Sequence, residues 1–376
     1  MQRNFIIALI FVVSLFFYGC SNAQKNDGTE QTTTLEDETN KLSIYTTLYP
    51  LEDFIKKIGG DYVEVESIIP AGADAHSYEP TTKQMTSIAV ADAFIYNGLN
   101  MEPFAEKIAT SLKNENVKFV EAANGVDAIA HEDQHQHEVD EHDHDDDEHS
   151  HGTEEHEHEH GEDEHEHGAE EHEHEHDDKH EHSAEEHEHE HGVDEHEHNH
   201  DHGGIDPHIW LDPTRAVKLA ENIKIALIEL NPDAQEYFEN NFVALADELT
   251  TLDQQFKDLV ESKNNPEILV SHAAYGYWEE RYGIKQIAVS GLTPANEPSQ
   301  RELKKIAELA QEKQLKYILF EQNVTSKIAE IVKNEIGATP LYLYTMESIS
   351  EDERNNGEDY FSLMNKNLST LEQALQ

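Results

Sequence analysis

Short apolar runs alternate with amphipathic stretches in the first third of the chain. β-Branched and aromatic runs predict strands, and apolar positions spaced three and four apart predict helices. Gly59-Gly60 and Pro70 are stop signals between these elements. The predicted strands are Leu42–Leu48, Val63–Ile69, Ala93–Tyr96 and Val117–Val120, and the predicted helices are Leu51–Ile58 and Glu102–Asn114.

The same alternation returns after residue 264. Strands that alternate with helices are typical of parallel sheets covered by helices on both faces. The sequence therefore predicts an α/β protein with two lobes, each a mostly parallel sheet flanked by helices. The second series of predicted strands is Ile268–Val270, Ile287–Val289, Tyr317–Phe320 and Leu341–Tyr344, and its helices are Tyr275–Tyr282, Ser299–Lys313 and Thr325–Ile336.

A long amphipathic stretch connects the two series. It carries one apolar stripe, with steps of four and three residues between Phe238 and Leu259. This pattern predicts a helix from Asp233 to Ser262, about 45 Å long at 1.5 Å per residue, which can brace both lobes. The predicted domains are an N-terminal lobe at 41–232, a linking helix at 233–263 and a C-terminal lobe at 264–376.

The first forty residues indicate a targeting segment. Phe5–Tyr18 is almost entirely apolar and follows Arg3. It is shorter than the roughly 20 residues that span a membrane, and it fits a secretory signal peptide. Cys20 follows directly, as in bacterial lipoprotein signals, and as the only cysteine it excludes an intrachain disulfide. We predict a signal peptide at 1–19 and a flexible tether at 20–40 after lipidated Cys20; the alternative is a plain signal peptide with an incidental cysteine.

Charge is distributed very unevenly along the chain. There are 80 Asp and Glu residues against 26 Lys and Arg, a net charge of −54. This charge excludes nucleic-acid binding and electrostatic adsorption to anionic lipid. Residues 131–202 hold 33 acidic residues, one lysine and 24 of the 27 histidines, so −22 remains for the rest of the chain. The motif Glu-Glu-His-Glu-His-Glu-His recurs at 154–160, 170–176 and 185–191.

This histidine-rich segment has too little apolar surface to offset the entropy of ordering a chain. We therefore expect a disordered insert at about 125–204, inside the first lobe. Neutral imidazoles bind borderline-soft divalent metals, and the carboxylates raise the local cation concentration. Many weak, exchanging sites are expected. Capture, buffering, delivery and sensing of metal all remain open roles for the insert.

Only three histidines lie outside the insert, and each stands at a junction between a predicted strand and a helix. They are His76, His208 and His272, and the last stands just beyond Ile268–Val270, after Ser271. Glu321 follows a predicted strand in the same way. In open α/β sheets, ligand sites form beyond the carboxyl ends of strands. A lone histidine is more often structural, but the shared placement of these residues favours one metal site.

Several motifs contain these residues or lie near them in the sequence. The motifs are Gly72–Thr81, Asp206–Pro213, Ser271–Tyr277, Ser290–Leu292, Glu297–Ser299 and Phe320–Asn323. With them, the chain from Lys41 to Gln376 resembles the zinc and manganese branch of the solute-binding lipoproteins of bacterial ABC importers. The resemblance implies ligands His76 and His208 from the first lobe, and His272 and Glu321 from the second. The chain departs from the family at Ala75, where proline is usual, and the fourth ligand varies among family members.

The implied ligand set favours zinc. Three imidazoles and one carboxylate suit tetrahedral Zn²⁺, whereas Mn²⁺ prefers more oxygen ligands. In the manganese relatives the third position resembles a carboxylate, and here it is His272. Cu²⁺, Co²⁺ and Ni²⁺ also bind imidazole. The resemblance implies a monomeric, extracytoplasmic, high-affinity Zn²⁺ receptor. It would be lipid-anchored at Cys20 on the outer face of the cytoplasmic membrane and pass zinc to an ABC importer permease and its ATPase.

Other functional classes remain as alternatives. A surface zinc buffer or adhesin of the same fold shares every site residue, and an Mn²⁺ receptor differs only in its metal. A zinc hydrolase needs an open position for an activated water. Glu321 closes that position, and the sequence has no nucleophile elbow, so we predict no enzyme. Because the expected ligands come from two braced lobes, we expect small closure, with release by docking to the permease or by ligand protonation.

Overall fold

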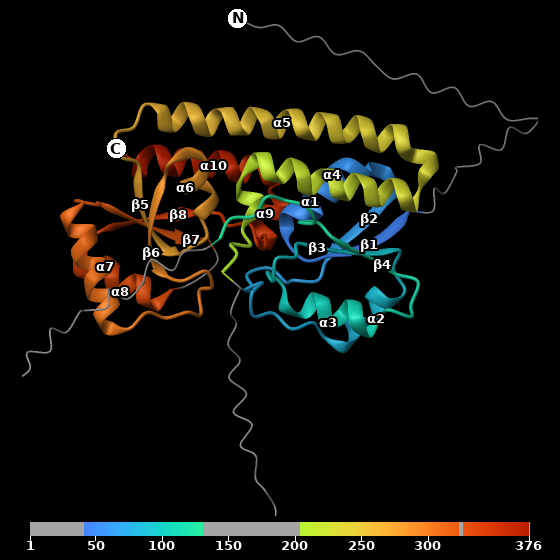
Figure 1. Cartoon of the computed structure of the whole chain (residues 1–376), viewed down its shortest axis with the longest axis horizontal. Helices are drawn as coiled ribbons and strands as arrows, with labels where there is room; N and C mark the ends of the chain where they lie inside the picture. The colour runs from blue at the N-terminus through green and yellow to red at the C-terminus, as the bar shows by residue number, and fades with distance from the viewer. Residues whose placement is uncertain (1–40, 131–203, 323–325, 376) are drawn as a thin grey trace, which may run out of the picture. The chain divides into compact units, whose positions relative to one another are not determined.

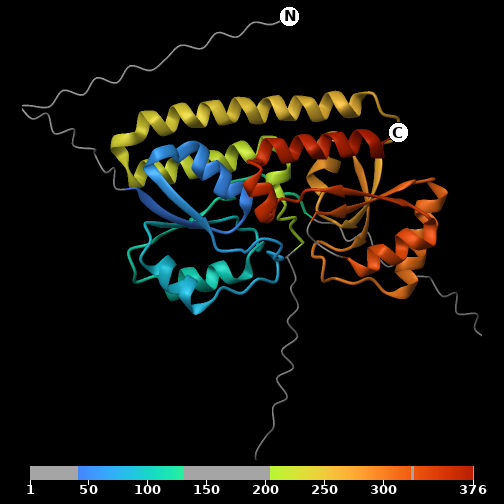
Figure 2. The ribbon, with the colours of Figure 1, turned by 180° about the vertical axis from the view of Figure 1, so that it is seen from behind.

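The first lobe is built on a sheet of four parallel strands. The computed structural model describes residues 41–130, 204–322 and 326–375, which belong to one unit, Lys41–Gln376. Figures 1 and 2 show helix α1 on one face of the sheet and helices α2 and α3 on the other. The strands are β1 (Leu42–Thr46), β2 (Val63–Ser67), β3 (Ala93–Tyr96) and β4 (Lys118–Glu121), in the order β2-β1-β3-β4. The helices are α1 (Tyr49–Gly59), α2 (Thr82–Ala89) and α3 (Pro103–Ser111), and a 3₁₀ turn, η1, covers Gly60–Tyr62.

Local signals explain where these helices begin and end. Pro50 lies in the first turn of α1, where its fixed φ and missing N–H are tolerated. The helix ends at Gly60, whose φ of 52° lies in the region that favours glycine. Helix α2 begins with a capping box, in which Thr81 and Gln84 satisfy each other's backbone N–H groups.

The second lobe repeats this plan. Its four strands are also parallel, and they run in the order β6-β5-β7-β8. The strands are β5 (Glu267–His272), β6 (Lys285–Ser290), β7 (Tyr317–Glu321) and β8 (Thr339–Leu343). The helices are α6 (Gly276–Tyr282), α7 (Gln300–Glu312), α8 (Lys327–Ile336), α9 (Glu351–Asn355) and α10 (Tyr360–Ala374). The two sheets with their flanking helices confirm the predicted fold class.

Two long helices run along the lobes. Helix α4 (Pro213–Leu230) is followed by a short turn, η3 (Pro232–Ala234), and by α5 (Gln235–Glu261). Helix α5 contacts α1 and α4 on one side and α6 and α10 on the other, and it passes over both sheets in Figures 1 and 2. Its stripe is buried at Phe238, Leu245, Leu249, Leu252 and Phe256. The helix therefore lies against both lobes, inside the range 233–263 that the sequence predicts.

Buried hydrogen bonds join the two lobes beside a 3₁₀ turn, η2 (Ile209–Leu211). The indole Nε1 of Trp210 donates to the carbonyl of Thr345 at 2.6 Å, and the Tyr360 hydroxyl donates to the carbonyl of Trp210 at 2.7 Å. The indole of Trp278 donates to the carbonyl of Leu211 at 2.8 Å. One apolar cluster contains residues of both lobes, so the lobes share a core.

The residues that directly precede the histidine-rich segment pack against the core of the protein. Ala130 pairs with Ile205 in an isolated antiparallel bridge, so the two ends of the segment lie together. Val126 and Ile129, inside the insert expected at about 125–204, pack against the apolar cluster. The rest of the insert, the signal peptide, Cys20 and the tether lie outside the described residues. Within the described part of the chain, no helix combines the length and apolar character that crossing a membrane requires.

Candidate metal centre

Four side chains from four separate segments converge between the lobes. His76 lies in the loop between β2 and α2, and His208 directly precedes η2. His272 is the last residue of β5, and Glu347 lies in the loop after β8. All four are buried, with exposed fractions of 5%, 0%, 1% and 6% in that order. Each offers one ligand atom, and these atoms all lie within 4.8 Å of one another.

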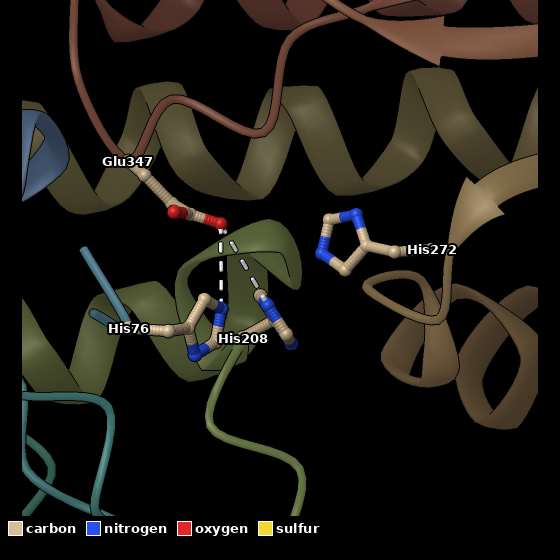
Figure 3. Close-up of side chains that lie close together, drawn as sticks. All are labelled: His76, His208, His272 and Glu347. Atoms are coloured by element: carbon tan, nitrogen blue, oxygen red, sulfur yellow. Dashed lines mark ion pairs between the residues drawn. The ribbon is translucent and has the colours of Figure 1, made fainter. Parts of the chain in front are cut away.

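The four groups face a common point. Figure 3 shows the Glu347 carboxylate directed at His76 and His208, with the His272 ring facing them from the second lobe. Oε1 of Glu347 lies 3.7 Å from Nε2 of His76 and 3.9 Å from Nε2 of His208. The His208 ring centroid lies 5.3 Å from that of His76 and 5.4 Å from that of His272. Each lobe thus supplies two of the four groups.

The electrostatics favour an ionised carboxylate at the centre of this group. Burial alone would raise the pKa of Glu347. The charges of His76, His208 and His272 outweigh burial and lower the pKa to about 2. Protonated imidazoles therefore keep Glu347 ionised, and the carboxylate supplies the negative charge that a bound cation requires.

The donor set fits a tetrahedral zinc ion. Nε2 of His272 and Oε1 of Glu347 are buried and have no hydrogen-bond partner among the described residues, which is costly unless another group binds them. Ligand atoms about 2.0–2.1 Å from a tetrahedral Zn²⁺ lie roughly 3.3 Å apart. The separations of 3.7 and 3.9 Å from Glu347 to the two first-lobe imidazoles need only a small contraction to reach that geometry.

Glu321 occupies a different place from the one that the sequence implied. It is the last residue of β7, next to β5 in the sheet, and its Oε1 contacts Nδ1 of His272. The same oxygen accepts a hydrogen bond from the Ser271 hydroxyl at 3.0 Å. Burial would lower the pKa of His272, but the charge and hydrogen bond of Glu321 raise it. Glu321 reaches the ring nitrogen that is remote from Nε2, so the structure does not bring it into the group of four.

The carboxylate in the group of four is Glu347, which the sequence reasoning missed. The signal was present, because Glu347 also follows a strand of the second sheet. It stands four positions beyond β8, after Met346, which adopts a left-handed φ of 62°. Contacts from the first lobe hold this loop: Tyr49 N donates to the Glu347 carbonyl at 3.3 Å, and Gly72 N donates to the Ser348 hydroxyl at 3.1 Å.

Asp206 was a second omission. Its Oδ1 lies 2.8 Å from Nδ1 of His208 and accepts the backbone N–H of the same residue at 2.9 Å. In the sequence it is the first residue of the motif Asp206–Pro213. Its spacing of two residues from a candidate ligand could have identified it.

Comparison with known proteins gives consistent matches over most of the chain. The family model described as zinc-uptake complex component A, periplasmic (ZnuA), matches residues 44–374. The zinc-binding lipoprotein AdcA of Streptococcus pneumoniae (strain ATCC BAA-255 / R6) is 32% identical over 379 residues, which cover 99% of this chain and 61% of AdcA. The chain thus spans about three fifths of the length of that relative.

A shorter relative and a solved structure match along nearly their whole lengths. The high-affinity zinc uptake system protein ZnuA of Bacillus subtilis (strain 168) is 31% identical over 371 residues, covering 99% of this chain and 96% of that protein. The crystal structure of the Zn(II)-bound ZnuA-like domain of S. pneumoniae AdcA is 30% identical, with a TM-score of 0.62. The match covers 89% of this chain and 99% of the chain in that crystal structure.

Proposed function

The chain belongs to the family of zinc-uptake complex component A (ZnuA), and from this premise we propose that it is an extracytoplasmic Zn²⁺ receptor for an ABC importer. Its ligands are His76, His208, His272 and Glu347, with Glu347 in the place that the sequence implied for Glu321. Zinc is the cargo of this protein, bound between the lobes and passed on.

The observation that carries this proposal is the buried convergence of three imidazoles and one carboxylate from both lobes. Four ligands of which most are nitrogen atoms suit Zn²⁺, whereas Mn²⁺ prefers more oxygen ligands and a higher coordination number. The set therefore favours a zinc receptor over a manganese receptor.

The same four ligands argue against a zinc hydrolase. Catalytic zinc sites keep a position open for water or substrate. Here Glu347 supplies a fourth ligand atom to the three imidazoles, which closes a tetrahedral set. A carrier of zinc needs a closed set, because it must hold the ion without reacting.

Delivery follows from the placement of the ligands. An ion held by both lobes is released when the lobes separate slightly or when an imidazole takes up a proton. Helix α5 lies against both lobes, so the closure is small and docking to the permease supplies the opening. Lipidated Cys20 tethers the monomeric receptor to the outer face of the cytoplasmic membrane, beside the permease and its ATPase.

Zinc titration of the full chain and of a variant lacking residues 131–202 tests the site. Ala130 and Ile205 lie together, so the deletion can be closed with a short linker. The deleted variant keeps only three histidines, His76, His208 and His272, and should bind one zinc ion tightly. Loss of the tight site on deletion would place its ligands in the insert and overturn the assignment.

Import is tested in the cell. Removal of the chain should lower the uptake of radioactive zinc when the medium is poor in zinc, and reintroduction should restore it. Reintroduction of His272→Ala should not restore uptake. Full uptake by a cell that carries only His272→Ala would contradict the proposed role.

A further inference from the structure

Two of the imidazoles are each held by a buried carboxylate, one in each lobe. Asp206 contacts Nδ1 of His208, and Glu321 contacts Nδ1 of His272. The exposed fractions of these two carboxylate residues are 1% and 3%. In both pairs the carboxylate engages the ring nitrogen remote from the metal group, and Nε2 is left as the ligand atom.

We propose that Asp206 and Glu321 are positioning residues that fix the tautomer and aim of His208 and His272 for zinc. The inference rests on the proposed function. A carboxylate at Nδ1 keeps the proton on that nitrogen, so Nε2 presents its lone pair to the ion. It also raises the basicity of the imidazole, which strengthens the bond to the metal.

The geometry of the second-lobe pair is set by the sheet. Strands β5 and β7 are neighbours, with Val270 registered against Leu319. His272 and Glu321 each lie two residues beyond that pair, at the carboxyl ends of both strands. The Ser271 hydroxyl donates to the same Glu321 oxygen at 3.0 Å. Oε1 of Glu321 therefore has two partners, and both of them lie on β5.

The first-lobe pair is held by contacts from both lobes. Asp206 Oδ1 accepts the backbone N–H of His208 as well as contacting its ring, and the Tyr277 hydroxyl donates to the Asp206 carbonyl at 2.6 Å. A Cβ on Gly276 would stand 2.5 Å from Asp206 Oδ2. Glycine at this position thus lets the start of α6 approach the carboxylate, and the second lobe sets the place of a first-lobe ligand.

The test compares Asp206→Asn and Glu321→Gln in the full chain with wild type. The matched control is Asp253→Asn, a buried carboxylate whose hydrogen bonds come from Lys257, Arg281 and Tyr282. Zinc affinity is measured in chelator buffers that keep weak sites empty. Each positioning variant should lose about 10- to 100-fold in affinity, whereas the control should bind like wild type.

A spectroscopic probe separates positioning from general stability. Co²⁺ added at less than one equivalent reports ligand geometry through its visible absorption bands. Both positioning variants should change these bands, and Asp253→Asn should not. Wild-type affinity and bands in both positioning variants would overturn the inference, as would an equal loss in the control.

A steric variant covers the case in which the polar variants fail to fold. Gly276→Ala keeps every polar group and pushes on Asp206 Oδ2, so it should weaken zinc binding and alter the Co²⁺ bands. Its control is Gly291→Ala, where an added Cβ would meet nothing closer than 3.4 Å. Unchanged binding and bands in Gly276→Ala would contradict the role of Asp206. Absence of a tight zinc site in wild type itself would instead overturn the proposed function, and this inference with it.

Discussion

The ends of β7 and β8 each place a glutamate near the metal group, but the two glutamates have different tasks. Glu321 is the last residue of β7 and engages Nδ1 of His272. Glu347 lies four positions past β8, in a loop held by the first lobe, and its Oε1 faces the imidazoles. A glutamate at the strand end stays within its own sheet, whereas one on the following loop crosses to the site. The distance past the strand end thus decides which carboxylate can be a ligand.

The largest expected effect comes from removal of the loop glutamate. Glu347→Ala deletes the only carboxylate in the group of four and leaves three imidazoles without a fourth ligand. Loss of a positioning residue typically lowers metal affinity by about 10- to 100-fold. The loss of zinc affinity in Glu347→Ala, measured by chelator competition, should be larger than this. A larger loss in Glu321→Ala than in Glu347→Ala would reverse the two assignments.

The strand-end glutamate should act only through His272. Glu321→Gln should lower zinc affinity by about 10- to 100-fold in wild type, but it should add almost nothing in a His272→Ala background. A double-mutant cycle measures this coupling. If the two losses were additive, Glu321 would act on the metal independently of His272.

The pH dependence of zinc binding should also separate the two glutamates. Glu321 raises the pKa of His272 above its ordinary value of 6.5, so zinc affinity should fall as the pH drops through that raised value. Glu347, with a pKa of about 2, stays ionised over this range and adds no step. Removal of the charge in Glu321→Gln lowers the pKa of His272, so the fall in affinity should move to lower pH. Zinc affinity is measured across a pH series for wild type and Glu321→Gln. The same midpoint pH of the fall in affinity in both proteins would refute this prediction.

The smallest effect is expected at the anchor of the Glu347 loop. Ser348→Ala removes the oxygen that accepts the N–H of Gly72, a bond between the lobes worth about 0.5–1.5 kcal/mol. Denaturant unfolding of the metal-free chain should show a loss of about this size, with a slight loss of zinc affinity. Ser369→Ala, which removes an exposed hydroxyl bonded within α10, is the control away from the site and should leave zinc affinity unchanged. A Ser348→Ala chain as stable as wild type would show that this bond does not hold the loop.

Much of the fold could be predicted because its signals are local. Buried strands such as Ala93–Tyr96 are short apolar runs bounded by polar residues, and α5 carries one long apolar stripe. Helix α10 was not predicted, although its buried positions follow the helical spacing that the sequence shows; here the signal was local and was missed.

Two signals predicted the site: His76 and His208 stood out as histidines outside the insert, and two further residues stood out because each ends a strand. His272 and Glu321 are the last residues of their strands, so the rule that ligands gather at carboxyl ends found both. Glu347 depends on a turn through Met346, whose left-handed φ of 62° is unusual for such a side chain. No residue type there signals the turn. The rule also could not tell a ligand from a positioning residue. Which ring nitrogen a carboxylate contacts depends on the tertiary structure.

A crystal structure of the zinc-loaded chain, with anomalous data collected on both sides of the zinc edge, tests the central claim most directly. The account predicts one strong anomalous peak bound by His76, His208, His272 and Glu347, with Glu321 still on Nδ1 of His272. A peak coordinated by Glu321 with Glu347 turned away, or a peak remote from the three imidazoles, would contradict it.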